Sequence, residues 1–196
     1  MSTDCQSQEQ DRLDAESVRR VRGGEPDAFA DIVLRYTSLL YALSFRMLDA
    51  DEEESKEAVQ EIFAKLYRYL PRFDAEKRFF SWMYTVALNH LRSEQRRRRV
   101  RKRASLPFGG AATRFLTDPA MAPDERAVSA EGERIVHEAL ARLGRRQREV
   151  FVLCEVEELS AREAAEILGI SESAVRTRLF RARAALRKMI IDGRSA

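Results

Sequence analysis

Residues 159–188 constrain the fold most strongly, because they hold the start and stop signals of two short consecutive helices. Ser160, followed three residues later by Glu163, has the spacing of a capping box and predicts a helix that begins directly after the serine. Gly169 suits the left-handed residue that ends a helix, and Ser171 is a favourable cap for the next one. The sequence therefore predicts a helix-turn-helix.

The second of these helices has two distinct faces. Its apolar residues recur at helical spacing and should form one buried stripe, made of Val175, Leu179, Ala182 and Leu186. In such a motif the second helix enters the major groove, where arginine can read guanine and threonine can donate or accept a hydrogen bond. The candidate DNA-reading residues lie off the stripe: Ser173, Arg176, Thr177, Phe180 and Arg181. An ordinary solvated helix pair is less favoured, because cap, turn glycine and basic face occur together in the right order.

Charge alternates in blocks along the chain. The net charge is −6 over residues 1–70, +8 over 71–110, −3 over 111–158 and +4 over 159–196, although the whole chain carries only +3. Two basic blocks separated by acidic ones are typical of a protein that meets nucleic acid at two places and another partner elsewhere.

Several classes of protein are disfavoured by the sequence. The N-terminus is polar and lacks the pattern of a signal peptide, and no apolar run approaches the length of a membrane span. Cys5 and Cys154 are too few for a disulfide framework or a zinc site. His90 and His137 are isolated and are expected on helix surfaces or at caps. We therefore expect a cytoplasmic protein without membrane insertion, metal or other cofactor.

Hydrophobic periodicity is helical nearly everywhere, which predicts an all-α fold with two helical domains joined by a flexible linker. A disordered tail is expected at 1–13, a first domain at 14–99, the linker at 100–122 and a second domain at 123–191. Within the first domain, helices are expected at about 14–22, 26–47, 53–70 and 78–99.

The last helix of the first domain combines aromatic residues with a basic tail. Aromatic rings stack on unpaired bases, while arginines hold the backbone, so this combination favours single-stranded or melted DNA. The alternative is that the aromatic residues, above all Trp82, pack in the core and that the arginines form a solvated charge run. The candidate residues are Trp82, Tyr84, Asn89, Arg96 and Arg97.

Several segments together resemble the extracytoplasmic-function (ECF) group of the sigma-70 family of bacterial transcription initiation factors. The resemblance covers about residues 26–99, as region 2, and 124–190, as region 4. It is carried by the helix-turn-helix and by Asp27-Ala-Phe…Arg35-Tyr, Glu57-Ala-Val-Gln-Glu-Ile-Phe63, Phe80-Ser-Trp-Met-Tyr-Thr-Val-Ala-Leu-Asn89 and Leu143-Gly-Arg-Arg-Gln-Arg-Glu-Val-Phe-Val-Leu.

This resemblance implies a protein that binds core RNA polymerase, reads the −35 and −10 promoter elements and assists promoter melting. Region 2 would dock on the clamp helices of the largest subunit, and the polymerase flap region is a further expected contact. The loop at about Asp74 to Arg78 would capture a flipped base, whose identity we leave unassigned. An anti-sigma partner is also expected. The docking residues would be Glu57, Gln60, Glu61 and Phe63, although Lys56 stands where the group often has an acid.

Two other functions remain as alternatives. A repressor or activator would use only the helix-turn-helix, and would leave the aromatic and basic helix of the first domain unexplained. An enzyme is disfavoured, because we find no phosphate-binding glycine loop, nucleophile elbow, metal-ligand spacing or acid/base pair.

Overall fold

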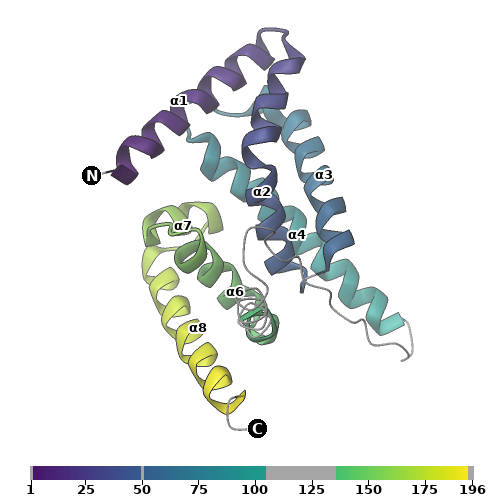
Figure 1. Ribbon diagram of the computed structural model, residues 1–196, viewed down its shortest axis with the longest axis vertical. Coiled ribbons are helices and arrows are strands. Elements are labelled where there is room, and N and C mark those ends of the chain that lie inside the picture. Colours follow the sequence, from purple (N-terminus) through teal and green to yellow (C-terminus); the bar gives the residue numbers. More distant parts are fainter. Residues whose placement is uncertain (1, 50, 105–135, 194–196) are drawn as a thin grey trace, which may run out of the picture. The chain divides into compact units, whose positions relative to one another are not determined.

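The computed structural model describes residues 2–49, 51–104 and 136–193, and every regular element within these ranges is a helix (Figure 1). The expected all-α fold is confirmed. The chain divides into two compact units. The first holds Met1–Ser44 and Glu53–Arg98, and the second holds Phe45–Glu52 and Arg99–Ala196.

The first unit is a helical bundle. Its elements are α1 (Ser2–Arg22), the 3-10 turn η1 (Pro26–Ala28), α2 (Phe29–Met47), α3 (Glu52–Tyr69), the 3-10 turn η2 (Leu70–Arg72) and α4 (Phe79–Ala104). Its core is built from aliphatic residues that recur every three or four positions on α2, α3 and α4. The fully buried members include Ile32, Leu40, Leu43, Ile62, Leu66, Met83, Leu88 and Leu91.

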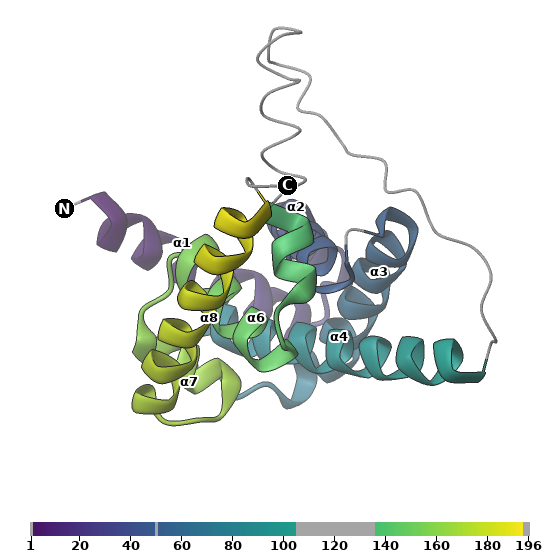
Figure 2. The ribbon, with the colours of Figure 1, turned by 90° about the horizontal axis from the view of Figure 1, so that it is seen from below.

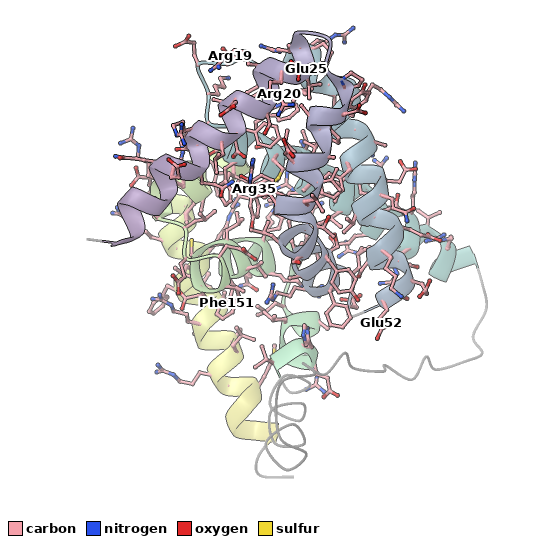
Figure 3. All side chains as sticks on the ribbon, turned by 45° about the horizontal axis from the view of Figure 1, so that its top comes forward. Arg19, Arg20, Glu25, Arg35, Glu52 and Phe151 are labelled. Carbon is pink, nitrogen blue, oxygen red and sulfur yellow. The ribbon has the colours of Figure 1, made fainter. Side chains whose placement is uncertain are left out.

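Two glycines end α1 and turn the chain into α2. Gly24 has φ +97°, a conformation that glycine adopts at little steric cost. The Gly23 amide donates to the carbonyl of Arg19 at 2.9 Å. The Arg20 side chain reaches back to Glu25 at 3.0 Å, and Figure 3 shows both residues at this turn. The glycine pair therefore ends α1.

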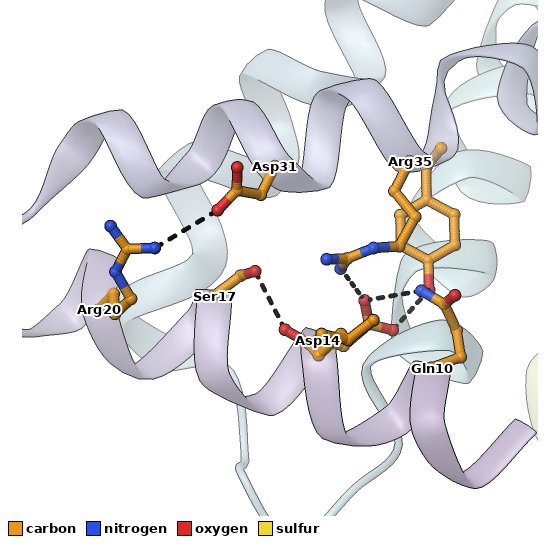
Figure 4. Close-up of polar contacts among 8 residues, drawn as sticks. Gln10, Asp14, Ser17, Arg20, Asp31 and Arg35 are labelled. Carbon is orange, nitrogen blue, oxygen red and sulfur yellow. Dashed lines mark hydrogen bonds and ion pairs between the residues drawn. The ribbon is translucent and has the colours of Figure 1, made fainter.

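The expected disordered tail at 1–13 is wrong, because α1 begins at Ser2. The reason is a polar network that hydrophobic periodicity cannot detect. Asp14 is fully buried and accepts hydrogen bonds from Arg35 at 2.6 Å and from the Tyr36 hydroxyl (Figure 4). Gln10 also donates to the Tyr36 hydroxyl at 3.2 Å. A buried charge needs such partners, so this network fixes α1 on α2.

The second unit contains the helix-turn-helix. Residues 136–142 are helical, and α6 (Arg145–Phe151), the π-helical turn η3 (Val152–Val156), α7 (Ala161–Leu168) and α8 (Glu172–Gly193) follow. The helix α8 contacts both α6 and α7, as the two views in Figures 1 and 2 also show. The core that α8 shares consists of Ala139, Leu140, Leu143, Ala182 and Leu186. Residues Val152–Val156 form a π-helical turn.

The linker begins later than expected. The helix α4 runs to Ala104, so residues 100–104 are helical rather than part of a flexible segment. Arginine, lysine and alanine are good helix formers, and the first helix-breaking residue after them is Pro107. The remainder of the expected linker, and residues 123–135 of the expected second domain, lie outside the described residues.

One described helix is long and apolar enough to cross a membrane by length and composition. It spans Pro26–Met47, with a mean hydropathy of 1.2 in its most apolar window. The expectation that no run approaches this length is therefore corrected. Ile32, Leu40 and Leu43 of this helix have no exposed area because they belong to the core of the first unit, whereas Leu34 is 81% exposed.

Candidate nucleic-acid interfaces

The first helix of the helix-turn-helix is capped at both ends as predicted. The Ser160 hydroxyl accepts from the Glu163 amide at 3.2 Å, and the Glu163 carboxylate accepts from the Ser160 amide at 3.0 Å. Gly169 has φ +65°, and the Ile170 amide donates to the carbonyl of Ala165 at 3.1 Å. These contacts satisfy backbone groups that a helix end leaves unpaired, and they fix the angle at which the next helix starts.

The second helix, α8, begins as predicted and buries the predicted stripe. The Ser171 hydroxyl accepts from the Ala174 amide at 3.2 Å. The stripe residues Val175 and Ala182 are completely buried, Leu186 is 7% exposed, and Leu179 is half-buried. The rotation of α8 about its own axis is therefore fixed by packing.

All five predicted DNA-reading side chains lie on the exposed face of α8: Ser173, Arg176, Thr177, Phe180 and Arg181. Phe180 is 74% exposed, which is unusual for a large apolar residue and fits contact with a thymine methyl group. Thr177 donates its hydroxyl to the carbonyl of Ser173 at 2.9 Å, so its oxygen remains available as an acceptor. Arg176 pairs with Glu172 at 3.1 Å, but its side chain is 71% exposed, so the pair is weak and can exchange.

One contact on α8 joins residues that are far apart in the sequence. Arg183 donates to the carboxylate of Glu155 in η3 at 2.5 Å. The two residues are 28 positions apart, so no local spacing rule could indicate the pair. Glu155 therefore competes with any DNA phosphate for this arginine.

The basic tail of α4 divides into arginines that face solvent and one that is tied to the protein. Arg96 and Arg97 are exposed, as is Asn89. Arg97 pairs with Glu94 on the same helix at 2.7 Å. Arg98, by contrast, bonds Glu54 on α3 at 2.6 Å, and its side chain is only 17% exposed. Arg98 thus anchors the tail while its neighbours can meet phosphates.

The aromatic candidates on α4 behave differently from one another. Trp82 is half-buried and packs against Phe73 and Phe79, with ring centroids 4.8 and 5.6 Å away. Tyr84 is completely buried and contacts Phe80 at 4.8 Å. A ring with both faces covered cannot stack on a base, so the assignment of Tyr84 to DNA binding is corrected to core packing.

The segment between α3 and α4 is an ordered loop. The Asp74 carboxylate accepts from the Glu76 amide at 3.2 Å, and the Asp74 carbonyl accepts from the Lys77 amide at 3.0 Å. The Trp82 amide then donates to the carbonyl of Arg78 at 3.2 Å at the start of α4. Aspartate commonly forms such side-chain turns, so the loop holds a defined shape. It lies between Phe73 and Phe79, which both pack against Trp82.

Three of the four predicted docking residues lie on the surface of α3. Glu57, Gln60 and Glu61 are exposed and share one side of the helix at spacings of three and four. Phe63 is only 9% exposed and packs edge-on against Phe29, with centroids 6.3 Å apart. Its proposed part in docking is corrected, because it belongs to the core. Lys56, the departure from the family pattern, pairs with Glu53 at 2.8 Å.

His90 is buried rather than on the helix surface. Lys65 donates to its Nδ1 atom at 2.6 Å, so the proton of the neutral ring lies on Nε2. Burial, followed by the nearby Lys65 charge, lowers the pKa of His90. In the part of the chain that the structure describes, no group of three or more histidine, cysteine or acidic residues could hold a metal ion.

Comparison with known proteins agrees with this geometry. The family model "Sigma-70 region 2" matches residues 32–101, and "Sigma-70, region 4" matches residues 133–186. The ECF RNA polymerase sigma factor SigW of Bacillus subtilis (strain 168) is 32% identical over 180 residues, covering 89% of this chain and 95% of its own. The RNA polymerase sigma-H factor of Pseudomonas aeruginosa is 31% identical, covering 94% and 95%.

A solved structure extends the likeness to the fold. CnrH in complex with the cytosolic domain of CnrY superposes with a TM-score of 0.67 at 27% identity, covering 92% of this chain and 98% of CnrH. The two family matches lie in the same order as the two units with their candidate DNA-binding surfaces. The chain belongs to the ECF group of sigma-70 family RNA polymerase sigma factors.

Proposed function

We propose that this protein binds core RNA polymerase, directs it to promoters by reading the −35 and −10 elements, and assists promoter melting. It is a binding factor rather than an enzyme, and it acts in the cytoplasm, where the polymerase works. The proposal assigns −35 reading to α8, and −10 reading and melting to the start of α4, its basic tail and the preceding loop.

The observation that carries this proposal is the outward face of α8. Its five candidate residues are all exposed, while the opposite stripe fixes the helix in the core of its unit. The N-terminal half of a recognition helix reaches base edges, so we expect Ser173, Arg176 and Thr177 to lie closest to the bases. Arg183 and Arg187 lie further along, where phosphates are the expected partners.

Polymerase docking is assigned to the exposed side of α3. Glu57, Gln60 and Glu61 present two carboxylates and an amide on one side of the helix, which suits a basic coiled-coil partner. The double reversal Glu57→Lys with Glu61→Lys should weaken the binding of core polymerase by at least tenfold, a loss of roughly 1.4 kcal/mol or more. Glu53→Lys, at an 81% exposed position on the same helix, is the matched control.

An anti-sigma partner is the second part of the proposal. CnrH, which covers nearly all of this chain, was solved with the cytosolic domain of CnrY bound to it. We expect a cytosolic protein segment of that class to hold this chain away from the polymerase.

The deciding experiment is reconstitution with core polymerase. The full chain should co-purify with core polymerase and confer run-off transcription from specific promoters in a genomic DNA library. Arg176→Ala should reduce that transcription without reducing co-purification. A repressor or activator would instead bind a specific duplex tightly as the isolated chain and would fail to support initiation by core polymerase.

A further inference from the structure

The loop Phe73–Arg78 is held at its first end by an arginine from α1. Arg22 donates to the carbonyls of Leu70 at 3.2 Å, Pro71 at 3.3 Å and Phe73. Its guanidinium also lies 6.0 Å from the centre of the Phe73 ring. Carbonyls at the C-terminal end of a helix lack partners within the helix, so a cation placed there is favourable. Arg22 thus links the end of α1 to η2, the turn that connects α3 to the loop.

The other end of the loop is held by a second residue of α1. Asp11 accepts from the Nε of Arg78 at 2.9 Å. Between these two contacts, α1 and the loop face each other across a cleft of about 430 Å³. Ala15 and Val18 line the cleft from α1, and Lys77 lines it from the loop. The helix therefore forms one wall of the cleft and fixes both ends of the opposite wall.

The helix that supplies these contacts is itself firmly attached. Asp14 lies between Asp11 and Arg22 on α1 and is bonded in the interior to Arg35 and Tyr36 of α2. The Tyr36 ring in turn packs against Phe79, the first residue of α4, at 6.1 Å. A displacement of α1 would therefore disturb a buried charge, which makes α1 a rigid support for the loop.

These contacts affect the shape of the loop more than the stability of the fold. The side chains of Arg78 and Asp11 are 38% and 34% exposed, and ion pairs at that exposure contribute little to stability. Arg22 acts through geometry, because its planar fork can serve several carbonyls at once and a lysine ammonium cannot reproduce this arrangement.

We propose that Arg22 and Asp11 are positioning residues for −10 recognition: through them, α1 holds the loop Phe73–Arg78 in the conformation that receives the unpaired base. This inference rests on the proposed function, which assigns −10 base capture to that loop. Neither residue needs to touch DNA.

The test compares Arg22→Lys and Asp11→Ala with Arg12→Ala in reconstituted holoenzyme. Arg12 is the matched control, because it lies on the same helix and pairs with Glu9 at 2.6 Å on α1 itself. Run-off transcription is measured on templates that carry each of the four bases at every position of the −10 element. Core binding, helicity and the effect of −35 substitutions are measured in parallel.

We expect each of the two variants to reduce the preference for the best base at one −10 position by about threefold or more, since a single mismatched base pair typically costs 5- to 150-fold in such systems. Core binding and −35 dependence should stay unchanged, and Arg12→Ala should behave as wild type. A uniform loss over all four bases would mean a merely structural role and would overturn the inference, as would unchanged preference in both variants. If wild-type holoenzyme itself showed no −10 base preference, the proposed function would fail instead.

Discussion

The ion pair between Glu155 and Arg183 gives a sharp test of how α8 meets DNA. Arg183 lies on the recognition helix, seven residues beyond Arg176, where a phosphate contact is expected. In the structure its guanidinium lies 2.5 Å from the Glu155 carboxylate, so phosphate and carboxylate compete for the same donor. The substitution Glu155→Gln removes the competing charge, keeps the size of the side chain and leaves every DNA-reading residue in place.

The size of the effect follows from the exposure of the pair. The side chains of Arg183 and Glu155 are 58% and 30% exposed, and exposed pairs contribute about 0.2–1 kcal/mol to stability. Folding should therefore change by less than about 1 kcal/mol. Releasing one arginine for a phosphate should steepen the salt dependence by about 0.9 in the slope of log K against log salt. At low salt the affinity should rise by up to about fivefold, the equivalent of about 1 kcal/mol.

The assay is the binding of reconstituted holoenzyme to labelled promoter DNA, by fluorescence anisotropy across a salt titration. Glu166→Gln, an exposed glutamate of α7 in the same unit, is the matched control for the loss of one negative charge. The Glu155→Gln gain should be equal on promoters with altered −35 sequences, because a phosphate contact carries no base information. It should also vanish in an Arg183→Ala background. A gain confined to one −35 sequence, or one that persists without Arg183, would refute the reasoning.

Four further predictions concern the two units. Arg176→Ala should relax base preference at one −35 position and cost about 1–3 kcal/mol on the best promoter. Arg187→Ala should weaken all promoters alike and reduce the salt slope by about one; run-off transcription across a −35 library at two salt concentrations separates the two. Gly169→Ala should lower the free energy of unfolding, measured in urea, by about 1 kcal/mol. The cost comes from the backbone, since φ is +65° at this residue and no atom lies within 4 Å of the added carbon. The free energy of unfolding should decrease as pH falls below about 6.5, the ordinary pKa of histidine. The reason is that the unfolded chain protonates His90, whereas burial and the Lys65 charge lower the pKa of His90 in the fold. The slope should not exceed about 1.4 kcal/mol per pH unit, and it should be smaller in His90→Gln.

The helix-turn-helix could be predicted from the sequence because its determinants are local. Ser160 and Glu163, which form the capping box, are three residues apart. Gly169 has the positive φ that glycine adopts more readily than other residues, so its identity alone indicated the end of the helix. The stripe from Val175 to Leu186 is a single helical repeat. Local rules fix caps and helix faces, so the exposed −35 surface followed directly once the buried face was known.

The division of aromatic residues between core and surface could not be predicted in the same way. Tyr84 and Phe63 both lie in stretches that resemble functional motifs, yet Tyr84 is completely buried and Phe63 packs edge-on against Phe29 of another helix. Whether an aromatic ring is covered depends on which helix packs against it, and spacing along one helix does not reveal this. Among the predicted aromatic residues of α4, only Trp82 keeps part of its ring accessible.

The structure also changes how the basic blocks of the sequence should be interpreted. The block at 71–110 carries a net charge of +8, yet Arg98 within it is bound to Glu54 on α3 and is 17% exposed. In the block at 159–196, Arg183 is held by Glu155. Because only exposed cations can displace counterions from DNA, the salt slope of promoter binding should be smaller than the number of arginines suggests. Glu54 and Glu155, which hold these arginines, therefore reduce the attraction of each surface for phosphate. Discrimination between promoters then depends more on the base-reading side chains of α8 and on the loop Phe73–Arg78.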